Sequence, residues 1–193
     1  REVAAWAMYD FANSGYTTVV LTAVFNAYFV KVVAGDAPWA TFAWTLTLSV
    51  SCLLVMLTMP AIGAYADAHA AKKRLLFVST VGCVLGTLAL AGAGPGSVAL
   101  AVIAIVVSNY FYSVGESLVA AFLPELSRPE ALGKVSGWGW SFGYFGGMLS
   151  LGVCLAYVLG QAKTGASAVQ TVPVTMLMTG AIFALASIPT FVL

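Results

Sequence analysis

The chain has 193 residues, of which 61% are hydrophobic and 8% are charged, and its formal net charge is +1. Soluble domains carry roughly 25% charged residues, so this composition excludes a soluble globular protein. The apolar runs do not alternate with polar residues, as the strands of a membrane barrel would, so we expect helices that cross a membrane.

Six long apolar runs follow one another along the chain, and each can cross a hydrocarbon core of about 30 Å. The predicted spans cover residues 4–33, 39–66, 75–93, 97–124, 137–160 and 173–193. Together they form one six-helix transmembrane bundle over residues 1–193. The six spans form two groups, the first three and the last three. Because three spans cross the membrane an odd number of times, the second group is inverted relative to the first. We therefore predict an all-α polytopic membrane protein built as 3+3 inverted repeats.

Polar residues interrupt the first and the fourth span, and each set includes a carboxylate. A charge at bilayer depth costs about 2.5–3.5 kcal/mol on insertion scales, so it normally faces a cavity or a partner. The two stripes, each at helical spacing, are Asp10, Asn13 and Thr17, and Asn109, Tyr112, Ser113 and Glu116. We predict that they line a path for substrate or ion between the two helices. The alternative is hydrogen bonding that only joins helices, worth about 0.6 kcal/mol per pair.

The polar loop between the second and third spans carries a cluster of charges. Asp67 is followed by Lys72, Lys73 and Arg74. We predict that this gating loop, which begins near Gly63, forms an ionic latch that holds one conformational state of the protein. The alternative is a loop that only orients insertion into the membrane.

Basic residues are distributed unequally between the two sides of the predicted bundle. The side with more of them holds Arg1, Lys72, Lys73, Arg74, Arg128 and Lys134, and the other side holds Lys31 and Lys163. Basic residues in short loops stay in the cytoplasm, so six against two places both termini there.

Small residues recur along the fifth span. Gly139, Gly143 and Gly147 are four residues apart, a spacing that lets helix backbones approach closely. Trp138 and Trp140 stand near the start of this span, where an aromatic belt is expected.

The loop between the second and third spans resembles a known signature. Gly63, Asp67, Lys72, Lys73 and Leu75 match the motif between helices two and three of the major facilitator superfamily. The sequence departs from that motif where Arg, Gly and Arg are usual, at Ala68, Ala70 and Ala71.

A narrower resemblance is spread over most of the chain. The stretches YDFANS at 9–14, FLPEL at 122–126 and GKVSG at 133–137 are similar to motifs of the vacuolar amino-acid effluxer-like family. The glycine-rich run that follows also matches, with Gly139-Trp140, Gly143-Tyr144 and Gly146-Gly147. The resemblance implies the N-terminal six-helix half of a major facilitator transporter, which exports a small polar solute by alternating access. Amino acids are among the solutes that it implies.

Further expectations follow for partners and location. The partners we expect are membrane lipid, a small solute with a coupling proton, and a second six-helix half or a second copy of the chain. We expect no nucleic acid, no cofactor, no metal and no enzyme activity. The chain starts at Arg1 and ends within an apolar run, so we expect one piece of something larger. Richness in Ala, Gly and Val is typical of a GC-rich bacterial genome, hence of a bacterial plasma (inner) membrane.

Two alternatives to the transporter half remain open. One is a non-transporting membrane scaffold or assembly factor built on the half-fold. The other is a six-span carrier that dimerises.

Overall fold

The computed structural model describes residues 2–192, and these residues form helices and no strand. Six helical segments are long and apolar enough to cross a membrane: Glu2–Val33, Ala40–Ala68, Lys72–Gly92, Val98–Leu126, Pro129–Ala162 and Ala168–Val192. A helix satisfies all its backbone polar groups within one segment, which is why long apolar runs adopt it in lipid. The predicted all-α polytopic membrane fold with six spanning helices is confirmed. The inverted relation of the two triples stays a prediction.

Most spans consist of one long helix with short additions. The elements are α1 (Glu2–Tyr16), η1 (Thr17–Ala23), α2 (Phe25–Tyr28), η2 (Phe29–Val33), α3 (Ala40–Ala68), α4 (Lys72–Ala89), η3 (Leu90–Gly92), α5 (Val98–Ala120), α6 (Leu123–Leu126), η4 (Pro129–Ala131), α7 (Leu132–Ala162) and α8 (Ala168–Val192). The fifth spanning helix therefore begins earlier than the predicted span of residues 137–160, because α7 starts at Leu132.

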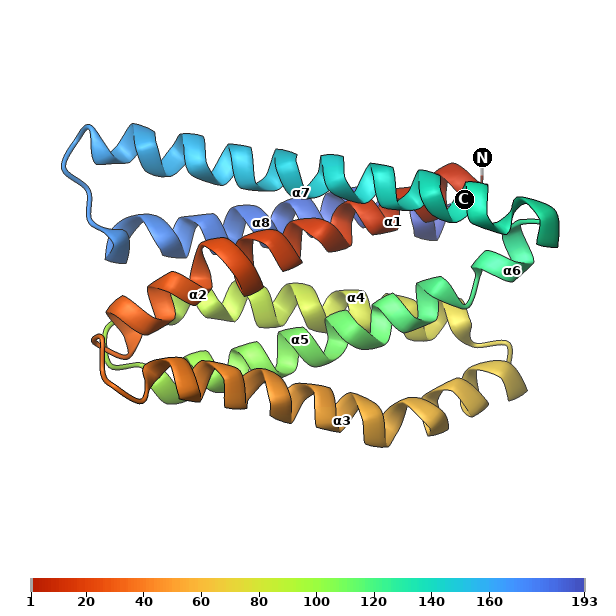
Figure 1. Ribbon diagram of the computed structural model, residues 1–193, viewed down its shortest axis with the longest axis horizontal. Helices are drawn as coiled ribbons and strands as arrows, with labels where there is room; N and C mark the ends of the chain where they lie inside the picture. The colour runs from red at the N-terminus through yellow and green to blue at the C-terminus, as the bar shows by residue number, and fades with distance from the viewer. Residues whose placement is uncertain (1, 193) are drawn as a thin grey trace.

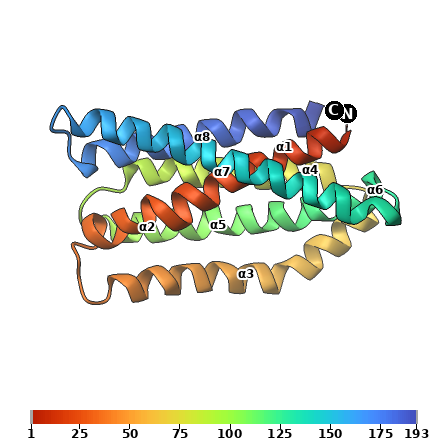
Figure 2. The ribbon, with the colours of Figure 1, turned by 45° about the horizontal axis from the view of Figure 1, so that its top comes forward.

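The helices pack around α1, which contacts α7, α8 and α5. On the other side of the bundle α5 packs against α3 and α4, and α4 also contacts α8. In Figure 1, α3 lies at one edge and α7 at the other, with α1 and α5 between them. Figure 2 shows that α3 bends in its C-terminal part, and α3 contains Pro60, which lacks the N–H that a helix needs there. The start of α1, the end of α8 and α6 lie at the same end of the bundle (Figure 1).

The first span is not a uniform α-helix, because η1 and η2 are π-helical. Their wider turns are seen in the bonds from the Val24 amide to the Val19 carbonyl (3.0 Å) and from the Ala34 amide to the Phe29 carbonyl (2.8 Å). The segment TTVVLTA in η1 is rich in β-branched residues, which crowd the preceding turn of an α-helix. π-helical turns occur frequently at functional sites, and η1 directly follows the polar stripe of α1.

The contact between α7 and α1 depends on glycines. A Cβ added at Gly143 would lie 2.8 Å from Ser14 Oγ and 2.9 Å from Asp10 Oδ2, and one at Gly139 would lie 2.5 Å from the Trp6 ring. At Gly147 it would lie 2.8 Å from Thr18 Oγ1. These separations are shorter than real carbon contacts, so the facing side chains would have to shift. At Gly146 a Cβ would meet the backbone of Phe11, which cannot move aside without separating the two helices.

Candidate functional site

A cavity of about 390 Å³ lies between the first, fourth and fifth spans. Its lining comes from α1, η1, α5 and α7: Asp10, Asn13, Ser14, Thr17, Thr18, Tyr112, Glu116, Trp140, Gly143, Tyr144, Gly147, Met148 and Leu151. Five of the seven residues predicted for the substrate or ion path are among them. None of these lining residues, all of them within the described part of the chain, is basic.

The α1 side of the cavity presents the whole predicted stripe. Asp10, Asn13 and Thr17 share one helical face and all three line the cavity. Asp10 is half-buried, whereas Asn13 is only 3% exposed. The Asn13 Oδ1 atom is buried without a hydrogen-bond partner. An unpaired buried carbonyl oxygen costs about 1–3 kcal/mol, so this atom lacks the hydrogen bond that a buried acceptor normally has.

The α5 side presents only part of its predicted stripe. Tyr112 and Glu116 line the cavity, and Glu116 is exposed there. Asn109 is buried and turned toward α3, where its Nδ2 donates to Ser51 Oγ over 3.0 Å. Ser113 is not among the lining residues. Successive residues of a helix are rotated by about 100°, so the four residues of the α5 stripe spread over roughly a quarter of the helix circumference. One side of the stripe, with Tyr112, therefore faces the cavity, while Asn109 faces α3.

A hydrogen bond joins the two sides of the cavity. The Thr17 hydroxyl donates to the Tyr112 hydroxyl over 2.9 Å. The Tyr112 ring also stacks on Tyr16, with ring centroids 5.0 Å apart, and Tyr16 shares a hydrogen bond of 2.8 Å with Ser108. The start of η1 is thereby fixed against α5, which sets the relative position of the two polar stripes.

The third side of the cavity was not predicted from the sequence. Trp140, Tyr144 and Met148 lie four residues apart on α7 and line the cavity, so Trp140 belongs to the cavity wall as well as to the start of the span. Gly143 and Gly147 also line it, because they let α7 approach α1 closely enough to enclose a cavity. The signal that could have revealed this wall is the four-residue repeat of aromatic residues beside the four-residue repeat of glycines.

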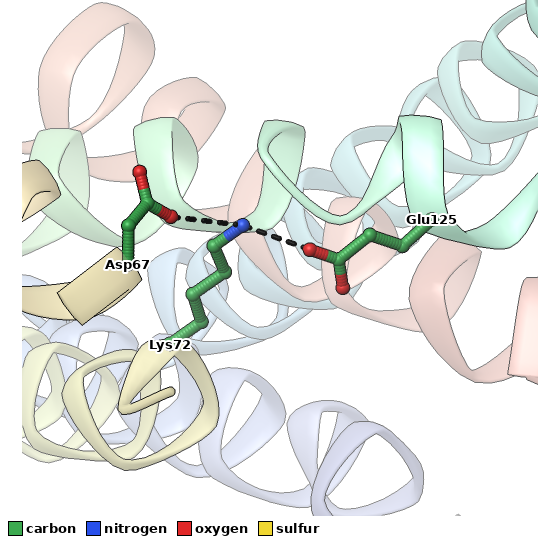
Figure 3. A network of polar contacts seen from close by, with 3 residues as sticks. All are labelled: Asp67, Lys72 and Glu125. Atoms are coloured by element: carbon green, nitrogen blue, oxygen red, sulfur yellow. Dashed lines mark hydrogen bonds and ion pairs between the residues drawn. The ribbon is translucent and has the colours of Figure 1, made fainter. Parts of the chain in front are cut away.

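A second polar site lies at the end of the bundle that holds α6. Lys72 Nζ is 3.2 Å from Asp67 Oδ1 and 2.8 Å from Glu125 Oε1, so one ammonium group connects the end of α3, the start of α4 and α6 (Figure 3). Of the predicted gating loop, Asp67 and Lys72 therefore pair. Lys73 and Arg74 are exposed and make no ion pair within the described residues, and Gly63 lies in α3 with open space beside it. Glu125 is the member that sequence analysis missed.

The turn between α3 and α4 has a left-handed residue. Ala70 has a φ of +47°, and the Ala71 amide donates to the Ala66 carbonyl over 2.9 Å. This is the arrangement in which many helices end, with glycine usual at the left-handed position. The motif that this loop resembles has glycine there, so the chain keeps the turn although it has lost the residue that favours it.

Comparisons with known proteins connect these features to a family. A family model described as "Vacuole effluxer Atg22 like" matches residues 26–133, more than half of the chain. The uncharacterized MFS-type transporter YxiO of Bacillus subtilis (strain 168) is 28% identical over 164 residues, which are 83% of this chain and 38% of that protein. The chain thus spans well under half the length of this relative. No solved structure is significantly similar to the chain.

Proposed function

The chain belongs to the family of Atg22-like vacuole effluxers, and on this premise we propose that it forms one half of a major facilitator transporter. In this proposal a small polar solute crosses the membrane through the cavity between α1, α5 and α7, with amino acids as candidate solutes. The observation that carries the proposal is the cavity itself, in which Asp10 and Glu116 from two different spans line one space.

The polar residues of the cavity support transport over a structural role. If the polar residues of the cavity only joined helices, their polar atoms would be paired with one another, as those of Asn109 and Ser51 are. Asn13 Oδ1 has no partner, and Glu116 is exposed on the cavity wall. An ionisable side chain at membrane depth normally faces a water-filled cavity or a partner. The cavity wall with Asn13 and Glu116 is therefore suited to line a solute path, with further helices covering its open side.

Alternating access requires a cover for this wall. In major facilitator transporters the site lies near the midplane, between two six-helix halves. The Bacillus relative is long enough for a second half, since the matched part is 38% of its length. We propose that a second half, or a second copy of the chain, packs over Trp140 and Tyr144, which are 65% and 66% exposed. Both termini and the Lys72 loop then face the cytoplasm of a bacterial cell, with the protein in its plasma membrane.

Flux through vesicles tests the proposal. The protein at its full natural length is reconstituted into lipid vesicles, and the release of radiolabelled amino acids is followed. We expect Asp10→Asn and Glu116→Gln to abolish release while the protein keeps its yield and thermal stability. The matched controls are Asp36→Asn and Glu130→Gln, which change exposed carboxylates outside the cavity and should release solute normally. Unchanged release in both cavity variants would reject the path, and a wild-type protein without flux would favour a scaffold.

A further inference from the structure

We propose that the cavity between α1, α5 and α7 binds the protonated amine of an organic solute, with Asp10 and Glu116 as its counter-charges. This inference rests on the proposed transport function and names the chemical class of the solute. It draws on the charge, the hydrogen-bonding groups and the aromatic side chains of the same cavity.

The charge of the cavity favours a cation. Asp10 and Glu116 line one space, and no lining residue in the described chain is basic. The ion pairs among residues 2–192 all involve Lys72, at the end of the bundle, so neither cavity carboxylate has a cationic partner in this unit. Two carboxylates that face one cavity in a low-dielectric surrounding repel each other and attract a positive charge. An anionic solute would meet repulsion from both.

The hydrogen-bonding groups favour a cation that carries N–H donors. Asn13 lines the cavity, is 3% exposed, and its Oδ1 atom accepts no hydrogen bond from the protein. A primary ammonium group has three donors and no acceptor. Such a group can therefore donate to the Asn13 carbonyl oxygen and to a carboxylate at the same time. A quaternary ammonium or a hydrocarbon cannot do so, because it has no N–H donor.

The aromatic side chains favour an organic cation over a bare proton. Trp140 and Tyr144 line the cavity from α7, with ring centroids 6.1 Å apart and planes tilted by 57°. Aromatic faces attract ammonium groups through the ring quadrupole. Met148 and Leu151, also on α7, add apolar surface against which the carbon skeleton of a solute can pack.

Binding of three matched probes tests the inference. Phenethylamine, 2-phenylethanol and phenylacetate have nearly the same size and are cationic, neutral and anionic. They are titrated calorimetrically into the protein at its full natural length in a non-ionic detergent. We expect phenethylamine to bind at least about tenfold more tightly than 2-phenylethanol, and phenylacetate not to bind, because charge pairs in a desolvated site are strong.

Variants show whether the preference belongs to this cavity. Asp10→Asn and Glu116→Gln should each weaken phenethylamine binding about tenfold or more and leave 2-phenylethanol binding unchanged. Asp36→Asn and Glu130→Gln are the controls, and Asp10→Glu, which keeps the charge, should retain the preference. Equal affinity of the wild-type protein for all three probes overturns the inference without any variant. So does a preference that survives in the Asp10→Asn/Glu116→Gln double variant.

The two proposals fail in different ways. Amino-acid release that depends on Asp10 and Glu116, together with equal binding of the three probes, leaves transport standing and rejects the amine site. Charge-selective binding by a protein that moves no solute across vesicles supports the amine site and rejects transport.

Discussion

The hydroxyl of Thr17 lies 2.9 Å from the hydroxyl of Tyr112 and donates a hydrogen bond to it, although 95 residues separate the two in the chain. Thr17 opens the π-helical segment η1, and Tyr112 belongs to the polar face of α5. This contact links the two polar stripes that line the cavity. It therefore determines where the carboxylate of one span stands relative to that of the other.

Thr17→Val should remove this link at nearly constant volume. Hydrogen bonds between membrane helices contribute about 0.6 kcal/mol on average and up to about 1.7, so we expect a loss of unfolding free energy in that range. Unfolding in mixed micelles measures it. Thr45→Val is the control, because Thr45 is exposed and its hydroxyl donates only to the Thr41 carbonyl of its own helix. Equal losses in both variants would show that the Thr17–Tyr112 bond contributes nothing specific.

Gly143→Leu should separate α7 from α1. A side chain at this position would overlap Ser14 and Asp10, and overpacking costs about 1–3 kcal/mol or prevents folding. We expect a lower yield and a lower melting temperature in detergent. Gly152→Leu, on the same helix, should change neither, because a Cβ added at Gly152 would lie in open space. Normal stability of the Gly143 variant would contradict the helix contact.

Ala70→Gly should stabilise the protein. Ala70 is held at a φ of +47°, which is unfavourable for a residue with a Cβ. Glycine relieves this strain, and the relief outweighs the entropy that glycine adds to the unfolded chain, so the expected net gain is about 0.5–1 kcal/mol. Ala68→Gly, within the last turn of α3, should instead destabilise by a similar amount. A melting temperature that falls for both variants would show that the turn is not strained.

Lys72→Met should loosen α6, because Lys72 supplies the ion pair to Glu125. We expect faster hydrogen–deuterium exchange in the peptide that spans 122–131. Lys73→Met is the control, since Lys73 makes no ion pair within the described residues. Both ion pairs lie at the surface and are screened by salt, so 1 M salt should raise exchange in the wild type toward that of the variant. Unchanged exchange in this peptide would contradict the contact.

Cysteine labelling should reveal the orientation in the membrane. Cys52, Cys83 and Cys154 are first replaced, and single cysteines are placed at Ala70 and Ala166. The excess of basic residues on the side of the Lys72 loop predicts that this loop is cytoplasmic. We expect an impermeant reagent to label position 166 in intact cells, and position 70 only after the cells are opened. The reverse pattern would invert the topology.

Residues on one helix explain why part of the site could be predicted. The positions of Asp10, Asn13 and Thr17 on a common face follow from helical periodicity, and all three line the cavity. The same reasoning grouped Asn109 with Tyr112, but Asn109 bonds to Ser51 of α3. Which edge of a polar stripe faces the cavity depends on the rotation of α5 against its neighbours, and periodicity within one helix carries no information on that rotation.

The sequence by itself determined the six spanning helices, because a long apolar run in lipid can satisfy its backbone groups only within its own helix. Only the tertiary structure decided that α7 supplies an aromatic wall to the cavity and that Lys72 reaches Glu125 as well as Asp67. These features arise between segments far apart in the chain. They depend on how closely helices approach and how each is rotated, which side-chain packing between helices sets.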